Sequence, residues 1–128
     1  MKKITVIFFT LMLSLGMAAQ DKIVLRLMGD STMADKDLSY ENPERGWGQM
    51  LPGFLTEDII VSNHAKNGRS TKSFIDESLW DIVVSRIRPG DYVFIQFGHN
   101  DEKPDPARHT DAGGSFDDNL RKFVLETR

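Results

Sequence analysis

Three apolar runs, each followed by a polar cluster, mark the chain from residue 22 onward. They cover residues 23–28, 59–61 and 92–97. The first run is interrupted only by Arg26 and the third only by Gln96, so both are typical of strands buried on both faces of a sheet. The second run predicts a shorter strand.

Apolar side chains between the second and third runs recur at the spacing of a helix. They are Phe74, Ile75, Leu79, Ile82, Val83 and Ile87. We predict one helix there, capped by Thr71 or Ser73 and ended by Pro89-Gly90. A second helix is predicted to begin near Trp47. A third is predicted from about residue 116, with its apolar side formed by Phe116, Leu120, Phe123 and Val124.

The alternation of strands and helices favours an α/β fold with a parallel sheet and right-handed crossovers. The polar stretch 101–115 contains Pro104, Pro106, Gly113 and Gly114, which is typical of a long loop between two elements. Residues 21–128 therefore form one small domain without a linker or repeat.

The first twenty residues are typical of a secretory signal peptide. Lys2 and Lys3 precede an apolar run over residues 4–15, and small residues follow it. The run is too short for a helix to cross about 30 Å of hydrocarbon, so no stable membrane anchor is expected. We expect a secreted or periplasmic protein. It contains no cysteine, so its stability depends on its core rather than on disulfides.

The charge and metal-ligand patterns exclude several partner classes. The net charge is -3 and the sequence pI is about 5.6, which makes nucleic acid an unsuitable partner. The sequence has no His-x-x-x-His pair, and its acidic residues lack the glycine and terminal glutamate of a calcium loop. We expect neither a metal nor another cofactor. The sequence leaves the oligomeric state open.

Polar clusters follow all three predicted strands, over residues 29–32, 67–70 and 98–101. Since the carboxyl ends of parallel strands share one edge of the sheet, we expect these corners to converge on one crevice. Ser31 supplies a hydroxyl for nucleophilic attack. The Gly68 N–H and the Asn100 side-chain amide supply donors for the oxyanion of a tetrahedral intermediate.

These clusters resemble the sequence blocks of the SGNH hydrolases, also called GDSL-like esterases. The chain is most similar to the rhamnogalacturonan acetylesterase branch, through Gly29-Asp30-Ser31-Thr32, Gly46-Trp47-Gly48, Asn67-Gly68-Arg69-Ser70 and Gly98-His99-Asn100-Asp101. The resemblance implies a flavodoxin-like three-layer α/β/α sandwich with strand order 2-1-3-4-5, of which this chain supplies strands 2, 1 and 3. It also implies that Ser31 is the nucleophile and that Gly68 and Asn100 form the oxyanion hole.

The fourth block of that family, Asp-x-x-His, has no counterpart before Arg128. It would supply the general base and the carboxylate that orients it. We therefore expect residues 21–128 to be the N-terminal part of an SGNH hydrolase domain, with little or no turnover on their own. The third strand is expected to leave an apolar edge unpaired and partly uncovered.

Four further residues are candidates for contact with substrate. Asp30 is one, although holding its own turn through backbone N–H groups is the favoured role for so short a side chain. Trp47 offers an aromatic face for a sugar ring. Arg69 is either a ligand for a uronic acid carboxylate or a solvated loop charge. His64 either shapes the crevice or has a structural role.

The favoured function is that of a serine esterase that removes acetyl groups from a pectic polysaccharide of the rhamnogalacturonan type. The other histidines are poor bases. If the alternation of the strand continues to Asn100 and Asn100 faces the site, His99 faces away from the site, and His109 lies in the long loop. One alternative is a carbohydrate-binding protein without catalysis. Another is a phosphate-ligand-binding module that uses the loop after the first strand, although Asp30 and Asp35 would repel an anion there.

Overall fold

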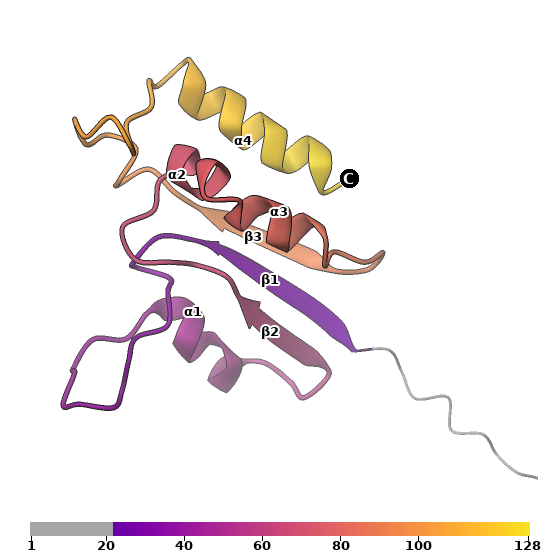
Figure 1. The fold of residues 1–128 in the computed structure, drawn as a ribbon. Coiled ribbons are helices and arrows are strands. Elements are labelled where there is room, and N and C mark those ends of the chain that lie inside the picture. The colour runs from indigo at the N-terminus through magenta and orange to yellow at the C-terminus, as the bar shows by residue number, and fades with distance from the viewer. Residues whose placement is uncertain (1–21) are drawn as a thin grey trace, which may run out of the picture.

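The computed structural model describes residues 22–128, and the predicted signal peptide lies outside them. A parallel sheet lies between a layer that contains α1 and a layer that contains α2, α3 and α4 (Figure 1). The elements in chain order are β1 (Ile23–Gly29), α1 (Trp47–Met50), the 3-10 helix η1 (Leu51–Phe54), β2 (Ile59–Asn63), α2 (Thr71–Asp76), α3 (Leu79–Val84), β3 (Tyr92–Gln96) and α4 (Ser115–Glu126).

The sheet has the strand order β2-β1-β3, and both pairings are parallel. This confirms the predicted strands, their order and the helices near residues 47 and 116. Strand β1 is the central strand, so its second half is buried on both faces. Leu25 and Leu27 pack with Met33 on one side, whereas Met28 packs with Phe74 on the other.

Arg26, the charge that interrupts the first apolar run, is buried together with Asp91. Its Nη2 and Nε lie 2.8 Å and 3.0 Å from Asp91 Oδ2, which also accepts the Arg88 N–H at 3.0 Å. Since a buried charge requires a partner, this pair explains how a central strand contains arginine. It also ties β1 to the turn that precedes β3.

The single helix predicted between β2 and β3 is wrong, because the structure has two short helices there. Ser78 separates them in the left-handed conformation, with φ of 55°. The cap of α2 is Ser70 rather than Thr71 or Ser73. The Ser70 side chain accepts the Ser73 N–H at 3.1 Å, and the Ser70 N–H donates to Ser73 Oγ at 2.9 Å, which completes a capping box.

Strand β3 is less buried than its apolar sequence predicts. Tyr92 is 59% exposed and Phe94 is 46% exposed, so burial on both faces is wrong for this strand. The reason is its place at an edge of the sheet formed by the described residues, where only β1 pairs with it. The exposed apolar side chains of β3 agree with the expectation that the third strand leaves an apolar edge partly uncovered. On α4, Phe123 is buried but Val124 is exposed, so Val124 does not share the buried side.

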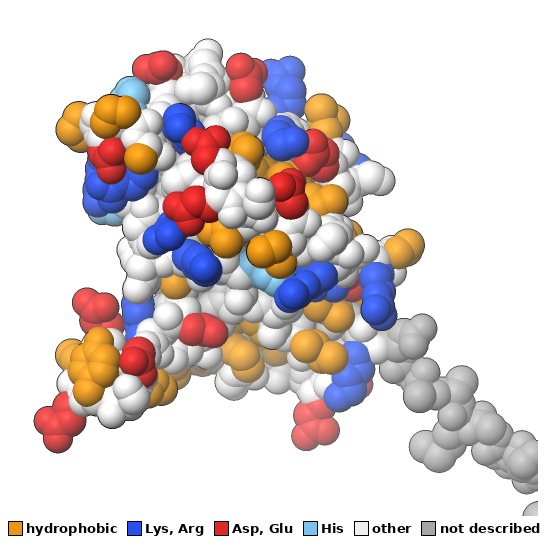
Figure 2. Space-filling model, in the orientation of Figure 1, with side chains coloured by type: hydrophobic (Ala, Val, Ile, Leu, Met, Phe, Trp, Pro, Cys, Tyr) orange, Lys and Arg blue, Asp and Glu red, His pale blue; other side chains and the backbone are white. Residues whose placement is uncertain are grey.

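Three further findings concern the surface charges, the helices and the groups that could bind a metal. Acidic and basic side chains are interspersed on the face seen in Figure 2, and neither sign forms a continuous field. Within residues 22–128, no helix is both long enough and apolar enough to cross a membrane. In the same range, no three acidic or histidine side chains are grouped as metal ligands.

Candidate active site

Ser31 lies in a tight turn directly after β1, and its neighbours hold that turn. Asp30 Oδ1 accepts the Thr32 N–H at 2.9 Å and the Thr32 hydroxyl at 2.8 Å. The Asp30 carbonyl accepts the N–H groups of Met33 and Ala34. Because Asp30 is only 1% exposed and its carboxylate is directed at Thr32, its position fits the structural role and not contact with substrate.

A chain of side-chain hydrogen bonds connects this turn to β3 and α1. The Trp47 Nε1–H donates to Gln96 Oε1 at 2.7 Å, and Gln96 Nε2 donates to Thr32 Oγ1 at 2.5 Å. The Trp47 backbone N–H also donates to the Thr32 carbonyl at 2.9 Å. The indole of Trp47 is partly exposed, but its polar atom is used within the protein. Trp47 therefore fixes the Ser31 turn, and only its ring face is available to a sugar.

The second corner contains Gly68, whose φ of +75° falls in the left-handed region that favours glycine. A Cβ at Gly68 would meet no atom within 4 Å. The glycine is therefore required by backbone conformation rather than by lack of space. Lys36 links this corner to the first, because its Nζ donates to the Ser31 carbonyl at 2.5 Å and to Asn67 Oδ1 at 2.8 Å.

The third corner contains Asn100, which is 2% exposed. Its Nδ2 donates to the carbonyl of Arg69 at 3.0 Å. One amide hydrogen is therefore used to hold the second corner, and an amide nitrogen carries a second hydrogen. The contacts of Lys36 and Asn100 thus join the three strand-end loops in series.

Asp101 is a positioning residue that the sequence reasoning missed. Its Oδ1 accepts the Thr71 N–H at 2.9 Å and the Thr110 hydroxyl at 2.9 Å, and it also accepts the Thr71 hydroxyl. Its Oδ2 accepts the Gly98 N–H at 3.1 Å. This buried carboxylate fixes the loop that contains Asn100 to the start of α2. The sequence analysis singles out Asp101 only as the last residue of the Gly98-His99-Asn100-Asp101 block.

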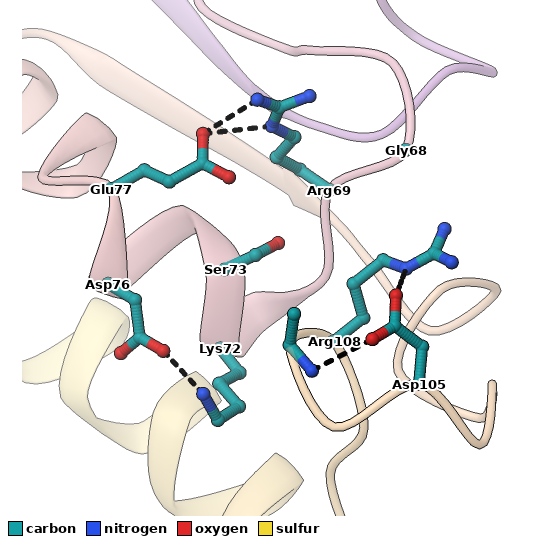
Figure 3. A pocket seen from close by; sticks show the side chains of 9 residues that line it. Gly68, Arg69, Lys72, Ser73, Asp76, Glu77, Asp105 and Arg108 are labelled. Atoms are coloured by element: carbon teal, nitrogen blue, oxygen red, sulfur yellow. Dashed lines mark hydrogen bonds and ion pairs between the residues drawn. The ribbon is translucent and has the colours of Figure 1, made fainter.

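Arg69 is paired with a carboxylate of the protein, and its side chain is still 34% exposed. Its Nη2 and Nε lie 2.7 Å and 3.0 Å from Glu77 Oε2 (Figure 3). Its Nη1 donates to the Asn67 carbonyl at 3.0 Å. All three guanidinium nitrogens therefore have partners within the protein.

The three histidines form their hydrogen bonds and ion pairs with residues other than Ser31. His64 Nε2 lies 2.9 Å from Ser62 Oγ. Burial, followed by the charges of Arg86 and Arg26, lowers the pKa of His64 from its usual value. His99 Nδ1 lies 3.5 Å from Glu102 Oε1, and His109 Nδ1 lies 3.0 Å from the Lys103 carbonyl. His64 instead lines a separate cavity of about 250 Å³ with Asn63, Ala65, Lys66, Leu79 and Ile82.

Ser31 itself lines an open cavity of about 350 Å³. The other lining residues are Thr32, Lys36, Glu44 and Arg45. A hydroxyl held in a fixed turn at the carboxyl end of a central strand, beside a space of this size, is suited to attack on a bound ester once a base activates it.

Comparison with known proteins identifies the family. Rhamnogalacturonan acetylesterase RhgT of Bacillus subtilis is 47% identical over 102 residues, which are 80% of this chain and 42% of RhgT. The chain is homologous to rhamnogalacturonan acetylesterases. A rhamnogalacturonan acetylesterase of Emericella nidulans is 39% identical over 75 residues, or 59% of this chain and 27% of that enzyme. No protein-family model matches this chain.

The structural comparison agrees with the sequence comparison. The crystal structure of YxiM from Bacillus subtilis matches with a TM-score of 0.74 and 27% identity, over 83% of this chain and 29% of YxiM. YxiM is described as an uncharacterized esterase. These comparisons confirm the predicted fold and the rhamnogalacturonan acetylesterase-like branch of the SGNH hydrolases. The chain spans less than half the length of these relatives.

Proposed function

We propose that this chain carries the nucleophile and the oxyanion hole of a serine esterase that removes acetyl groups from rhamnogalacturonan. The support is its 47% identity to RhgT over 80% of the chain, a stretch that includes most of the three strand-end loops. The observation that carries the proposal is the serial linkage of those loops. Lys36 joins the Ser31 loop to the Asn67 side chain, and Asn100 joins the third loop to Arg69.

In the proposed reaction, Ser31 Oγ attacks the carbonyl carbon of the acetyl group and gives its proton to a general base. The carbonyl oxygen becomes an oxyanion, which the N–H groups of Gly68 and Ser31 and the Asn100 amide stabilise. The bond to the sugar oxygen then breaks, and that oxygen takes the proton from the base. Water hydrolyses the acetyl-serine, which releases acetate and restores Ser31.

The general base is proposed to come from an Asp-x-x-His segment outside residues 21–128, which we propose are the N-terminal part of an SGNH hydrolase domain. Two observations support this. The three histidines present contact other groups than Ser31, and RhgT is more than twice as long as the matched stretch. We also propose that a signal peptide over residues 1–20 directs secretion. The relatives are named for rhamnogalacturonan, a polysaccharide that is too large to enter a cell unaided.

The test is Ser31-dependent hydrolysis of a chromogenic acetate ester. The chain and a version extended through the downstream reading frame are assayed in parallel, each with a Ser31→Ala control. We expect the extended protein to release acetate, and Ser31→Ala to abolish that release. Strong Ser31-dependent turnover by residues 21–128 alone would show that a histidine of this chain is the base.

Two outcomes would favour the alternative functions. Binding of acetylated oligosaccharides that survives Ser31→Ala, with no hydrolysis by any longer form, would favour a carbohydrate-binding protein. Thermal stabilisation by inorganic phosphate or flavin mononucleotide would favour a phosphate-ligand-binding module.

A further inference from the structure

The cavity lined by α2 and the loop that follows β3 has its charges neutralised within the protein. It measures about 510 Å³ and lies between α2 and the loop that follows β3 (Figure 3). Each cation on its wall is within 2.8 Å of a carboxylate: Arg69 of Glu77, Lys72 of Asp76 and Arg108 of Asp105. An anionic ligand would compete with these carboxylates for the cations, so this cavity is poorly suited to an anion.

The cavity beside Ser31 is different, because its cations face neutral oxygens. Lys36 Nζ donates to the Ser31 carbonyl and to Asn67 Oδ1, at 2.5 Å and 2.8 Å. The ammonium group has three hydrogens, so one remains for a ligand. Arg45 Nη1 donates to the backbone carbonyls of Asn42 and Glu44. Within residues 22–128, neither Lys36 nor Arg45 belongs to a salt bridge.

We propose that Lys36 and Arg45 bind the carboxylate of an acidic sugar unit beside the acetyl group that Ser31 attacks. This inference rests on the proposed esterase function and names the residues that select an acidic substrate. Lys36 is half-buried and directly contacts the Ser31 turn, so its charge acts at the reaction site. A charge-assisted hydrogen bond to a carboxylate is about twice as strong as a neutral one. The sequence suggested Arg69 as a ligand for a uronic acid carboxylate. We propose Lys36 and Arg45 for that role instead.

Glu44 sets the balance of charge in the same cavity. It lines the wall with Lys36 and Arg45, so the lining contains two cations and one carboxylate. Its negative charge repels a bound anion and limits the affinity. Removal of that charge is therefore expected to strengthen binding of an acidic sugar, which a purely structural role for Lys36 and Arg45 does not predict.

The test is calorimetric titration of the full chain with a galacturonate trimer and, separately, with its fully methyl-esterified form. We expect Lys36→Met and Arg45→Met each to weaken binding of the acid by about tenfold or more, and Glu44→Gln to strengthen it severalfold. Binding of the methyl ester is expected to change less than twofold. Lys122→Met is the matched control, because Lys122 is paired with Glu126 on α4.

Several results would overturn the inference. They are equal affinity for the acid and the ester, no binding of the acid by the wild type, or unchanged acid binding in Arg45→Met. The side chain of Arg45 is exposed and donates only to neighbouring carbonyls, so this variant keeps the test valid if Lys36→Met does not fold. Inorganic phosphate that competes fully at equal concentration would show a general anion site instead of a uronate site.

The outcome is separable from that of the proposed function. Lys36-dependent binding of the acid, without any Ser31-dependent acetate release by the extended protein, supports the carboxylate site and contradicts the esterase. Acetate release by the extended protein that does not distinguish acetylated galacturonate oligomers from their methyl esters supports the esterase and contradicts the carboxylate site.

Discussion

Asn100 Nδ2 donates a hydrogen bond to the Arg69 carbonyl across 3.0 Å. The contact joins the loop after β3 to the loop between β2 and α2, two segments separated by 31 positions in sequence. It leaves the second amide hydrogen of Asn100 for another acceptor. The candidate oxyanion donors Gly68 and Asn100 are therefore linked through one residue, Arg69, and any change that moves one loop affects both.

The buried carboxylate of Asp101 is predicted to be a main source of stability for the Asn100 loop. Asp101→Ala leaves the N–H groups of Thr71 and Gly98 and two threonine hydroxyls without their acceptor. We expect a loss of about 3 kcal/mol in the free energy of unfolding, measured by urea denaturation. Asp105→Ala is the control, because the Asp105 side chain is 41% exposed and bonds only within its own loop, and it should cost less than about 1 kcal/mol. Equal losses would contradict this account.

Gly48 is predicted to permit the close approach of α1 to the turn after Ser31. A Cβ there would lie 2.7 Å from the Met33 carbonyl oxygen and 2.8 Å from Asn63 Nδ2. Gly48→Ala is therefore expected to lower the free energy of unfolding by about 1–3 kcal/mol through overpacking. Gly53→Ala, where a Cβ meets no atom within 4 Å, should be neutral or slightly stabilising. The melting temperatures of the two variants check the prediction.

The Thr32 hydroxyl is predicted to fix the nucleophile turn. It donates to Asp30 Oδ1 and accepts from Gln96 Nε2. Thr32→Val keeps the shape of the side chain but removes both bonds. We expect a loss of about 1.5–3 kcal/mol in unfolding free energy, the range for hydrogen bonds to charged groups. Thr56→Val at an exposed position is the control. A near-neutral Thr32→Val would show that the turn is held by the backbone alone.

His64 is predicted to make stability depend on pH. Burial and the charges of Arg86 and Arg26 lower its pKa in the folded state, so the unfolded chain binds the proton more readily. The stabilising contribution is therefore complete above the usual pKa of 6.5 and is lost as pH falls through the lower folded-state pKa. Thermal melts from pH 7.5 to 5 should show a smaller fall in melting temperature for His64→Gln than for the wild type. Parallel curves would contradict the prediction.

The sequence predicts the strands and the position of Ser31 because burial of β1 leaves a strong apolar signal, whereas the strand order follows from the family resemblance and not from the apolar pattern. It does not predict the helix break at Ser78, since the apolar spacing continues through that position and a left-handed conformation leaves no mark in the pattern. Glu77, which caps the C-terminus of α2, pairs with Arg69 eight positions earlier, and the apolar spacing does not predict this contact. The contacts of Lys36 and Asn100 join residues 31 positions apart and depend on how the loops fold.

The most direct test measures acetate release from acetylated rhamnogalacturonan by the extended protein and its Asn100→Ala variant. If Asn100 faces the ester carbonyl beside Ser31, kcat falls by about 10²–10³ while KM changes little, because the lost bond forms mainly in the transition state. Arg69→Met, which keeps the carbonyl that Asn100 contacts, should retain most of the activity. An unchanged kcat in Asn100→Ala would contradict the convergence of Ser31 and Asn100 on one ester.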